Sequence, residues 1–277
     1  MFRIVEKRTL TPVTNLFRIE APLVARHAAA GQFVMLRVYE EGERIPVTIT
    51  DLDRETGLIT IVVQSVGKTS RLLNALEAGD ALLDLVGPLG TPAPLPQSGR
   101  AALIGGGFGA AAILSLAKEL QRRGLEVHAI VGARTSELVI LEQEVGAASD
   151  YLYICTDDGS RGYHGFVTGQ LAELHTQGLR FDAIYGIGPL PMMRSLADTT
   201  AGWGDPTWVS LDPLMLDGTG MCGGCRVYTQ EGMRFACIDG PFFDAHGVDY
   251  AKGAARTKMY REQEALALAT MEGGAGA

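Results

Sequence analysis

Three of the four cysteines lie close together in the last quarter of the chain, with two residues between the first pair and eleven before the third. Asp217 precedes this group, separated from Cys222 by four residues. The plant-type iron–sulfur pattern is Cys-x4-Cys-x2-Cys with a distant fourth cysteine. The stretch has that spacing with a carboxylate in place of the first thiolate. We therefore predict a 2Fe–2S cluster whose ligands are Asp217, Cys222, Cys225 and Cys237.

Glycines at positions 218, 220, 223 and 224 suit a loop that curls around such a cluster, because backbone N–H groups can then reach the sulfur atoms. Two other interpretations of the cysteines stay open. A structural zinc site could be completed by His246 or Asp244, and two of the thiols could pair as a disulfide. Asp217, which precedes a glycine, is also a common turn residue.

The whole-chain numbers describe a globular protein with ample core. The chain has 277 residues, of which 47% are hydrophobic and 20% are charged. A chain of this length is expected to form two domains, and a small third lobe is possible. A net charge of −8 argues against nucleic acid as a partner. The longest uncharged run, 101–117, is shorter than a membrane span and no secretory segment is visible, so we expect a cytoplasmic protein in a reducing compartment.

Residues 1–97 form the first predicted domain, a small antiparallel β-barrel. Short apolar or β-branched runs separated by turn residues indicate its strands, at 2–6, 15–19, 32–36, 47–50 and 58–63. A single helix over 69–76 interrupts them and ends at Gly79.

A candidate anion site precedes that helix, where Val66, Gly67, Lys68, Thr69 and Ser70 combine a glycine, a cation and two hydroxyls. Helix N-termini bind phosphate groups. A Walker A loop is excluded because position 62 is valine where that motif needs glycine. The pyrophosphate of a dinucleotide such as FAD remains, with an ordinary helix N-cap as the alternative. Gln64, just before the segment, is included in the candidate site.

A second candidate segment in the barrel consists of Arg44, Pro46, Val47 and Thr48. Pro46 must lie at a sheet edge or a strand start, which fixes where the Arg44 guanidinium and the Thr48 hydroxyl project. Such groups suit phosphate and flavin-ring contacts, and a plain edge strand is the alternative.

Residues 98–210 form the second predicted domain. The strand 101–104 runs directly into a glycine-rich turn containing Gly105, Gly106, Gly107 and Gly109, and the helix 111–123 follows. Strand, Gly-x-Gly-x-x-Ala and helix in this order predict a dinucleotide-binding turn. Further strands at 126–131, 151–155, 181–185 and 208–210 alternate with helices at 136–145, 166–175 and 191–199, which predicts a parallel sheet covered on both faces.

The acidic residue expected about 20 positions after the turn is missing, and Arg134 ends the second strand instead. Arg134 suits the 2′-phosphate of NADP or is a surface residue, so the choice between NAD(H) and NADP(H) stays open. Asp157 and Asp158 follow the third strand and can reach ribose hydroxyls, or simply form a turn. Gly188 and Pro189 follow the fourth strand, at the edge where open α/β sheets bind ligands. Cys155 lies on a buried-looking strand and is expected to be inert.

The last two predicted segments are a cluster lobe, 211–250, and a helical tail, 251–277, whose residues 272–277 are expected to be mobile. Within the lobe, 226–228 and 234–236 bracket Glu231-Gly232 and predict a β-hairpin that carries Cys237 outward.

Barrel, nucleotide sheet and cysteine lobe in this order resemble the ferredoxin–NADP reductase superfamily, in the branch of dihydroorotate dehydrogenase electron-transfer subunits. The stretches 211–227 and 237–241 carry the most specific part of the resemblance, which extends to about residue 250. Subunits that act on dihydroorotate usually show four cysteines. Asp217 in place of one cysteine matches members that work with NADPH and ferredoxin, and counts against the orotate type.

The resemblance implies an oxidoreductase subunit that binds FAD, exchanges hydride with NAD(H) and passes single electrons through a 2Fe–2S cluster. It implies a heterodimer with a larger subunit carrying a second flavin and 4Fe–4S clusters, which reaches ferredoxin by electron bifurcation. It assigns Arg44 to Thr48 to the flavin, 67–70 to its phosphates, and 105–109 with 156–160 to the nicotinamide nucleotide. A colourless, zinc-stabilised interaction module is the non-enzymatic alternative.

Overall fold

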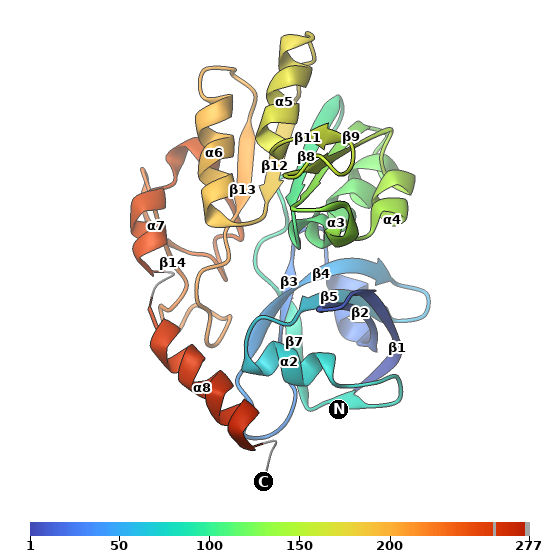
Figure 1. Ribbon diagram of the computed structural model, residues 1–277, viewed down its shortest axis with the longest axis vertical. Helices are drawn as coiled ribbons and strands as arrows, with labels where there is room; N and C mark the ends of the chain where they lie inside the picture. The colour runs from blue at the N-terminus through green and yellow to red at the C-terminus, as the bar shows by residue number, and fades with distance from the viewer. Residues whose placement is uncertain (257–258, 275–277) are drawn as a thin grey trace.

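The computed structural model describes residues 1–256 and 259–274. They form two sheets, one above the other in Figure 1, with a smaller lobe beside their junction. Among the helices of these residues, none is long and apolar enough to cross a membrane. The expected combination of an antiparallel barrel, a largely parallel nucleotide-type sheet and a small cysteine lobe is confirmed.

The first sheet has, within the described residues, seven antiparallel strands in the order β6-β1-β2-β5-β4-β3-β7. Its strands are β1 (Phe2–Thr11), β2 (Thr14–Glu20), β3 (Phe33–Arg37), β4 (Ile45–Asp53), β5 (Leu58–Gln64), β6 (Ala81–Leu82) and β7 (Asp84–Leu89). The sheet curves around a core of aliphatic side chains that also includes the fully buried Phe17. The five predicted strands are confirmed, and β6 and β7 are additional. β7 gave little sequence signal because it contains Gly87 and Pro88, which are tolerated there since it is an edge strand.

Two helices lie in this first part rather than the single one predicted, so that prediction was incomplete. They are α1 (Pro22–His27) and α2 (Lys68–Asn74). α1 covers the end of the barrel near β5 and β7, and is too short to show a helical period in the sequence.

The second sheet has the order β11-β10-β9-β8-β12-β13-β16 in the described chain. Its strands are β8 (Arg100–Gly106), β9 (Glu126–Ala133), β10 (Tyr151–Thr156), β11 (Tyr163–His164), β12 (Ala183–Ile187), β13 (Thr207–Ser210) and β16 (Phe242–Asp244). All pairings are parallel except that of β16, which returns from the cysteine lobe to pair antiparallel with β13. The strand order reverses between β8 and β12, which is where open sheets of this type bind ligands.

Helices cover both faces of this sheet, as predicted (Figure 1). They are α3 (Gly109–Arg122), α4 (Glu142–Ala147), α5 (Val167–Thr176) and α6 (Leu190–Thr200), with a short 3-10 turn η1 (Ser136–Leu138). A continuous helix over 136–145 was predicted and is wrong. Leu141 has a φ of 54°, a left-handed conformation that no α-helix can contain, so the segment divides into η1 and α4.

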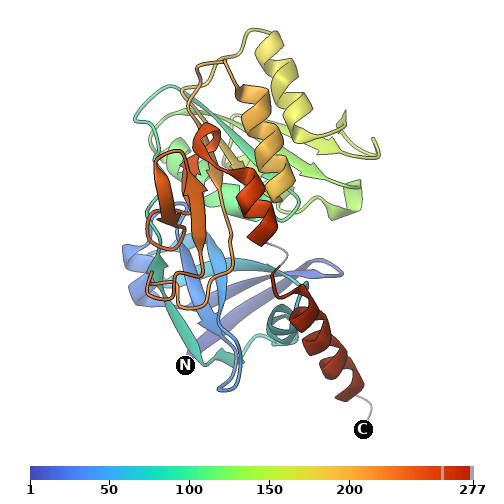
Figure 2. The ribbon, with the colours of Figure 1, turned by 90° about the vertical axis from the view of Figure 1, so that its left-hand side faces the viewer.

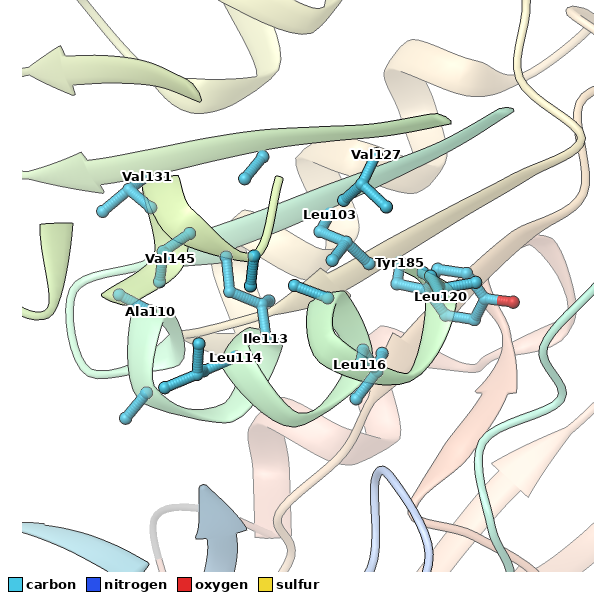
Figure 3. Close-up of a cluster of buried hydrophobic side chains, with 14 of the residues drawn as sticks. Leu103, Ala110, Ile113, Leu114, Leu116, Leu120, Val127, Val131, Val145 and Tyr185 are labelled. Atoms are coloured by element: carbon cyan, nitrogen blue, oxygen red, sulfur yellow. The ribbon is translucent and has the colours of Figure 1, made fainter. Parts of the chain in front are cut away.

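α3 joins the two sheets. Its small and aliphatic side chains, among them Ala110, Ile113 and Leu120, pack against Leu103 and Tyr185 of the second sheet (Figure 3). Its other side contacts β4 of the barrel, where Lys118 pairs with Asp51 at 2.5 Å. The alanine-rich sequence lets this helix approach both sheets closely.

The lobe contains the predicted hairpin, β14 (Arg226–Thr229) paired with β15 (Gly232–Phe235), followed by a 3-10 turn η2 (Ala245–Gly247). The helices α7 (Tyr250–Arg256) and α8 (Arg261–Gly274) follow, and α8 packs against α2 of the barrel (Figures 1 and 2). The expected mobile stretch 272–277 falls partly in α8, which extends to Gly274, and residues 275–277 lie outside the described chain.

Candidate functional site

Asp217 organises the start of the cysteine loop through backbone hydrogen bonds. One carboxylate oxygen accepts the Thr219 N–H at 2.7 Å and the other accepts the Cys222 N–H at 2.7 Å. The Thr219 N–H and the groups of Cys222 lower the pKa of Asp217, so the carboxylate is charged at neutral pH. A carboxylate has about four lone-pair positions. Asp217 can therefore hold the loop and still present an oxygen to iron.

The thiols of Cys225 and Cys237 lie 3.1 Å apart, and both residues are buried. Burial and the neighbouring Cys225 thiol raise the pKa of Cys237 well above its usual value. Cys222 is exposed, and its sulfur accepts the Gly224 N–H at 3.3 Å. The prediction that the hairpin carries Cys237 outward is wrong. After β15 the backbone N–H of Asp239 bonds to the Phe235 carbonyl at 2.8 Å, which turns the chain back and places Cys237 inside.

The donor set fits a binuclear cluster. Across residues 1–256 and 259–271, no three His, Cys, Asp or Glu side chains converge on one point that could hold a single metal ion. A 2Fe–2S cluster takes its protein ligands in pairs, one pair for each iron. Cys225 and Cys237 form one close pair, and Asp217 and Cys222, joined by a hydrogen bond, form the other.

The side chains that could complete a zinc site are engaged elsewhere. His246 Nε2 lies 3.0 Å from the Thr200 hydroxyl, and Asp244 accepts the His246 N–H at 3.0 Å as the cap of η2. Both belong to the edge where β16 joins the second sheet. Their contacts favour the structural role over zinc ligation.

The cysteine loop rests directly on the barrel. A Cβ at Gly218 would lie 2.6 Å from Met35 Cγ and 2.9 Å from Leu89 Cδ1, and Gly218 has a φ of +74°. Met35 belongs to β3 and pairs across the sheet with Pro46 of β4. The loop with the candidate cluster ligands therefore lies one strand away from the candidate flavin segment.

The candidate flavin segment of β4 divides between two faces. Val47 is buried in the barrel core, whereas Pro46 and Thr48 are half-buried on the opposite face. Arg44, just before β4, has a 48% exposed side chain and lies 3.7 Å from Asp84. Of the predicted residues, Arg44, Pro46 and Thr48 thus share an accessible face, and Val47 can offer a ligand only its backbone.

The start of α2 is held against this strand. Ser70 Oγ accepts the N–H groups of Val66 and Gly67 at 3.0 and 2.9 Å, and the Thr69 hydroxyl donates to Glu43 at 3.1 Å. Glu43 directly precedes Arg44, so the two candidate flavin segments meet here. The N-cap of α2 is Gly67 and not a hydroxyl residue, as the alternative interpretation expected, but Ser70 at the third helical position bonds back to it. Lys68 is half-buried, and Gln64 and Val66 are exposed beside it.

The glycine-rich turn between β8 and α3 combines close packing with one open position. A Cβ at Gly109 would lie 1.9 Å from the Ile187 carbonyl oxygen, and one at Gly105 would lie 2.9 Å from Ala110 N. Gly106 likewise has no room beside Met192. Gly107 has a φ of +55° and open space within 4 Å of its Cβ position. It is the member of the turn over which a ligand can approach the backbone.

The remaining predicted residues gather at the same edge of the sheet. The Asp158 N–H donates to the Arg134 carbonyl at 3.2 Å, which joins the ends of β9 and β10. Arg134, Asp157 and Asp158 are all exposed there, and hydrogen bonds from Ser160 lower the pKa of Asp158. Gly188 and Pro189 follow β12, across the reversal in strand order from β9. Cys155 is buried, as expected, and burial raises the pKa of its thiol to about 12.

Comparison with known proteins identifies the family. Residues 212–249 match the iron–sulfur cluster binding domain of dihydroorotate dehydrogenase B. A Thermotoga maritima homolog of the dihydroorotate dehydrogenase B (NAD(+)) electron transfer subunit is 43% identical over 250 residues, 90% of this chain and 88% of that protein. The electron transfer subunit of Geobacillus thermodenitrificans is 36% identical over 251 residues, 87% of this chain and 95% of that protein. The chain belongs to the dihydroorotate dehydrogenase B electron-transfer subunit family.

One solved structure is similar to this electron-transfer subunit over nearly the whole length. It is that of the NADH-dependent reduced ferredoxin-NADP oxidoreductase, studied for flavin-based electron bifurcation, and one of its chains is 40% identical to this one. The match covers 98% of each chain with a TM-score of 0.93. It includes the C-terminal helices beyond the matched iron–sulfur domain.

Sequence reasoning missed two residues of this electron-transfer subunit. Met35 lies in a predicted strand, and nothing in a single sequence indicates that the cysteine loop would touch it. Arg256 lies in the predicted helical tail, beyond the matched domain, and its Nη2 donates to the Gly224 carbonyl at 2.7 Å. The only available signal for Arg256 was a cation near the start of a helix-prone segment.

Proposed function

We propose that this chain is the electron-transfer subunit of an electron-bifurcating, NADH-dependent ferredoxin:NADP oxidoreductase. In this function it exchanges hydride between NAD(H) and a bound FAD and passes single electrons through a 2Fe–2S cluster to a larger subunit. The observation that carries the proposal is the contact of Gly218 with Met35, which places the cluster loop one strand from Pro46. The likeness in fold and length to the ferredoxin-NADP oxidoreductase chain supports the same assignment.

A flavin is required by the chemistry, because a nicotinamide transfers two electrons as hydride whereas an iron–sulfur cluster carries one. We assign the flavin ring to the accessible face of β4 formed by Arg44, Pro46 and Thr48, with the backbone of Val47. The flavin phosphates are assigned to residues 66–70 together with Gln64. There Gly67 and Lys68 supply an N–H group and a cation, and Ser70 holds the turn in shape.

We assign the nicotinamide nucleotide to the carboxyl edge of the second sheet. Gly107 gives the nucleotide phosphates access to the backbone. Gly105 and Gly109 let β8, α3 and β12 pack closely around it, and Gly106 leaves space for Met192 of α6. Asp157 and Asp158 are within reach of a ribose, and Arg134 beside them would accept a 2′-phosphate. Gly188 and Pro189 border the site on the side of β12.

Asp217 and Cys222 are assigned to one iron, and Cys225 and Cys237 to the other. Cys222 of the first pair is exposed and Asp217 is half-buried, whereas both cysteines of the second pair are buried, so the cluster would be asymmetric. A carboxylate is a harder ligand than a thiolate, and ligand identity is one lever on the potential of such clusters. The exposed side thus carries the more unusual ligand.

The partner is assigned to the face around the exposed Cys222. Large apolar side chains of the loop are accessible there, with Met221 at 89%, Leu216 at 57% and Ile238 at 47% exposure. Apolar groups clustered on a surface mark contact sites. We propose that a larger subunit with its own flavin and 4Fe–4S clusters docks on this face, and that ferredoxin and NADPH react with that subunit.

The proposed division of the chain follows the sheets and the lobe. We assign residues 1–97 to the flavin, 98–210 to the nucleotide, 211–250 to the cluster, and 251–277 to a helical tail. β16 is shared, since it lies in the cluster segment and completes the sheet of the nucleotide segment.

A dihydroorotate-oxidising complex is the second candidate function. It is favoured by the match of residues 212–249 to the domain of dihydroorotate dehydrogenase B. The carboxylate of Asp217 at the first ligand position speaks against it.

The test is anaerobic reconstitution followed by a visible spectrum and by assays of flavin and iron per chain. We expect bands of both flavin and a 2Fe–2S cluster, and their bleaching by NADH. A colourless protein would contradict the proposal. Isolation of the native complex then distinguishes the two candidates, since a partner that oxidises dihydroorotate would replace the first with the second.

A further inference from the structure

Arg256, the last residue of α7, reaches the cysteine loop from outside the matched iron–sulfur domain. Its Nη2 donates to the Gly224 carbonyl at 2.7 Å, across 32 positions of sequence. Its Nε is buried and, among the residues that the structure describes, has no hydrogen-bond partner. Among residues 1–256 and 259–271, no carboxylate forms an ion pair with it. A guanidinium is always protonated, so a positive charge rests here without an anion.

Gly224 connects this cation to a candidate ligand. Its N–H donates to Cys222 Sγ at 3.3 Å, while its carbonyl accepts from Arg256. A Cβ at position 224 would lie 3.4 Å from the same sulfur. The guanidinium is thus fixed on the peptide that joins the two cysteines of the Cys-x2-Cys pair, which are assigned to different irons.

A partly buried charge without a counter-ion is costly unless a negative group lies nearby. The loop is built to bind such a group, because three thiolates and a carboxylate give a 2Fe–2S cluster a net negative charge. Adding one electron makes that charge more negative by one unit, with no bond formed or broken. A fixed cation therefore stabilises the reduced cluster more than the oxidised one.

We propose that Arg256 is a positioning residue of the cluster, which holds the loop through Gly224 and raises the reduction potential of the 2Fe–2S centre by its charge. The inference rests on the proposed function. It adds a residue that lies beyond the cysteine motif, and it gives α7 a role in electron transfer.

The test compares Arg256→Gln with Arg256→Lys and with Lys252→Gln. Lys252 lies on the same helix but pairs with Asp249 at 3.2 Å and stacks over Tyr228. The readout is an EPR-monitored redox titration of the reconstituted protein. At a fixed applied potential, Arg256→Gln should lower the ratio of reduced to oxidised cluster about tenfold, a shift of about 59 mV for one electron.

The two parts of the proposal separate in the other variants. Arg256→Lys keeps the charge, so its potential should stay close to that of the wild type. It loses the planar guanidinium that holds the loop through Gly224, so the variant should release iron to a chelator faster than the wild type. Lys252→Gln should leave both the potential and the iron release unchanged. A titration of Arg256→Gln that superimposes on the wild type overturns the inference, and so does an equal shift in Lys252→Gln.

If Arg256→Gln binds no iron, Arg256→His is measured instead, because the charge of its histidine can be changed by pH within one variant. Its potential should fall as the pH is raised through the imidazole pKa of about 6.5, more than that of the wild type, whose arginine stays charged. Parallel pH profiles would overturn the inference. Failure of the proposed function looks different, because the wild type itself would then bind no 2Fe–2S cluster.

Discussion

Gly218 lies so close to Met35 that a Cβ at position 218 would come within 2.6 Å of Met35 Cγ. The two residues come from different parts of the chain, the cysteine loop and the third strand of the barrel. Met35 also shares a core with Cys225 and Cys237. The loop is therefore part of the packed core. It is packed into the barrel next to the strand assigned to the flavin, and this fixes the path between the two proposed redox centres.

Gly218→Ala should disturb that path. Alanine would have to adopt a φ near +74° and would collide with Met35 and Leu89. The strain and the displacement together should destabilise the protein by about 1–3 kcal/mol. We also expect slower reduction of the cluster by NADH, measured by stopped-flow spectroscopy, because the loop moves away from β3.

Gly232→Ala is the matched control for this variant. Gly232 has a φ of +116° in the same lobe, but nothing lies within 4 Å of its Cβ position. It should show the loss of stability from backbone strain and keep the rate of cluster reduction. If both variants slowed that rate equally, the contact with Met35 would have no part in electron transfer.

Asp217→Cys should keep a 2Fe–2S cluster and shift its reduction potential, since a thiolate is a softer ligand than a carboxylate. The measurement is a redox titration with EPR detection. Asp239→Cys serves as control, because Asp239 also accepts a backbone N–H in this lobe, that of Phe235 at 2.7 Å, without being a candidate ligand. An unchanged potential in Asp217→Cys would remove Asp217 from the ligand set.

The sequence predicted the features that depend on local pattern. Alternating apolar residues indicated the barrel strands, and the turn from Gly105 to Gly109 indicated the nucleotide sheet, because both follow from side-chain periods and glycine geometry. The cysteine spacing predicted which residues would share one loop. All of these signals lie within about 20 consecutive residues.

The sequence did not predict features that depend on contacts between distant residues. Cys237 was expected to point outward, and its burial in a core shared with Met35 of the barrel depends on packing that no local pattern shows. The break at Leu141 was missed since its residue type does not indicate a left-handed φ; the side chain is buried in the core beside α3. The bond of Arg256 to Gly224 spans two elements that meet only after the lobe has folded.

Two glycines of the nucleotide turn should respond differently to alanine. Gly107→Ala adds a methyl group into open space at a φ of +55°, so it should lower the free energy of unfolding by only about 1–2 kcal/mol. It should raise the KM for NADH, because the methyl group blocks the approach of the nucleotide phosphates to the backbone. Gly109→Ala would place a Cβ 1.9 Å from the Ile187 carbonyl oxygen and should lower the melting temperature strongly. Thermal unfolding and steady-state kinetics check both. An unchanged KM in Gly107→Ala would contradict the proposed nucleotide site.

Tyr185 ties the linker between the two sheets to the second sheet, since its buried hydroxyl donates to the Pro94 carbonyl at 2.5 Å. The same linker bonds to the barrel through Ala93 N and Ala30 O at 3.0 Å, and to the lobe through Thr91 N and Gly240 O at 2.6 Å. All three parts of the protein therefore meet at one short segment.

Tyr185→Phe removes one of these three ties while keeping the ring in the core. Loss of a buried hydrogen bond should lower the free energy of unfolding by about 1 kcal/mol, measured in urea. Hydride transfer from NADH to the flavin should also slow, because the sheet that holds the nicotinamide is then less firmly placed against the barrel. Tyr228→Phe controls for removal of a hydroxyl, as its ring contacts Lys252 through the π face. If Tyr185→Phe lost stability but kept the hydride-transfer rate, the linker would support the fold without setting the position of the nucleotide.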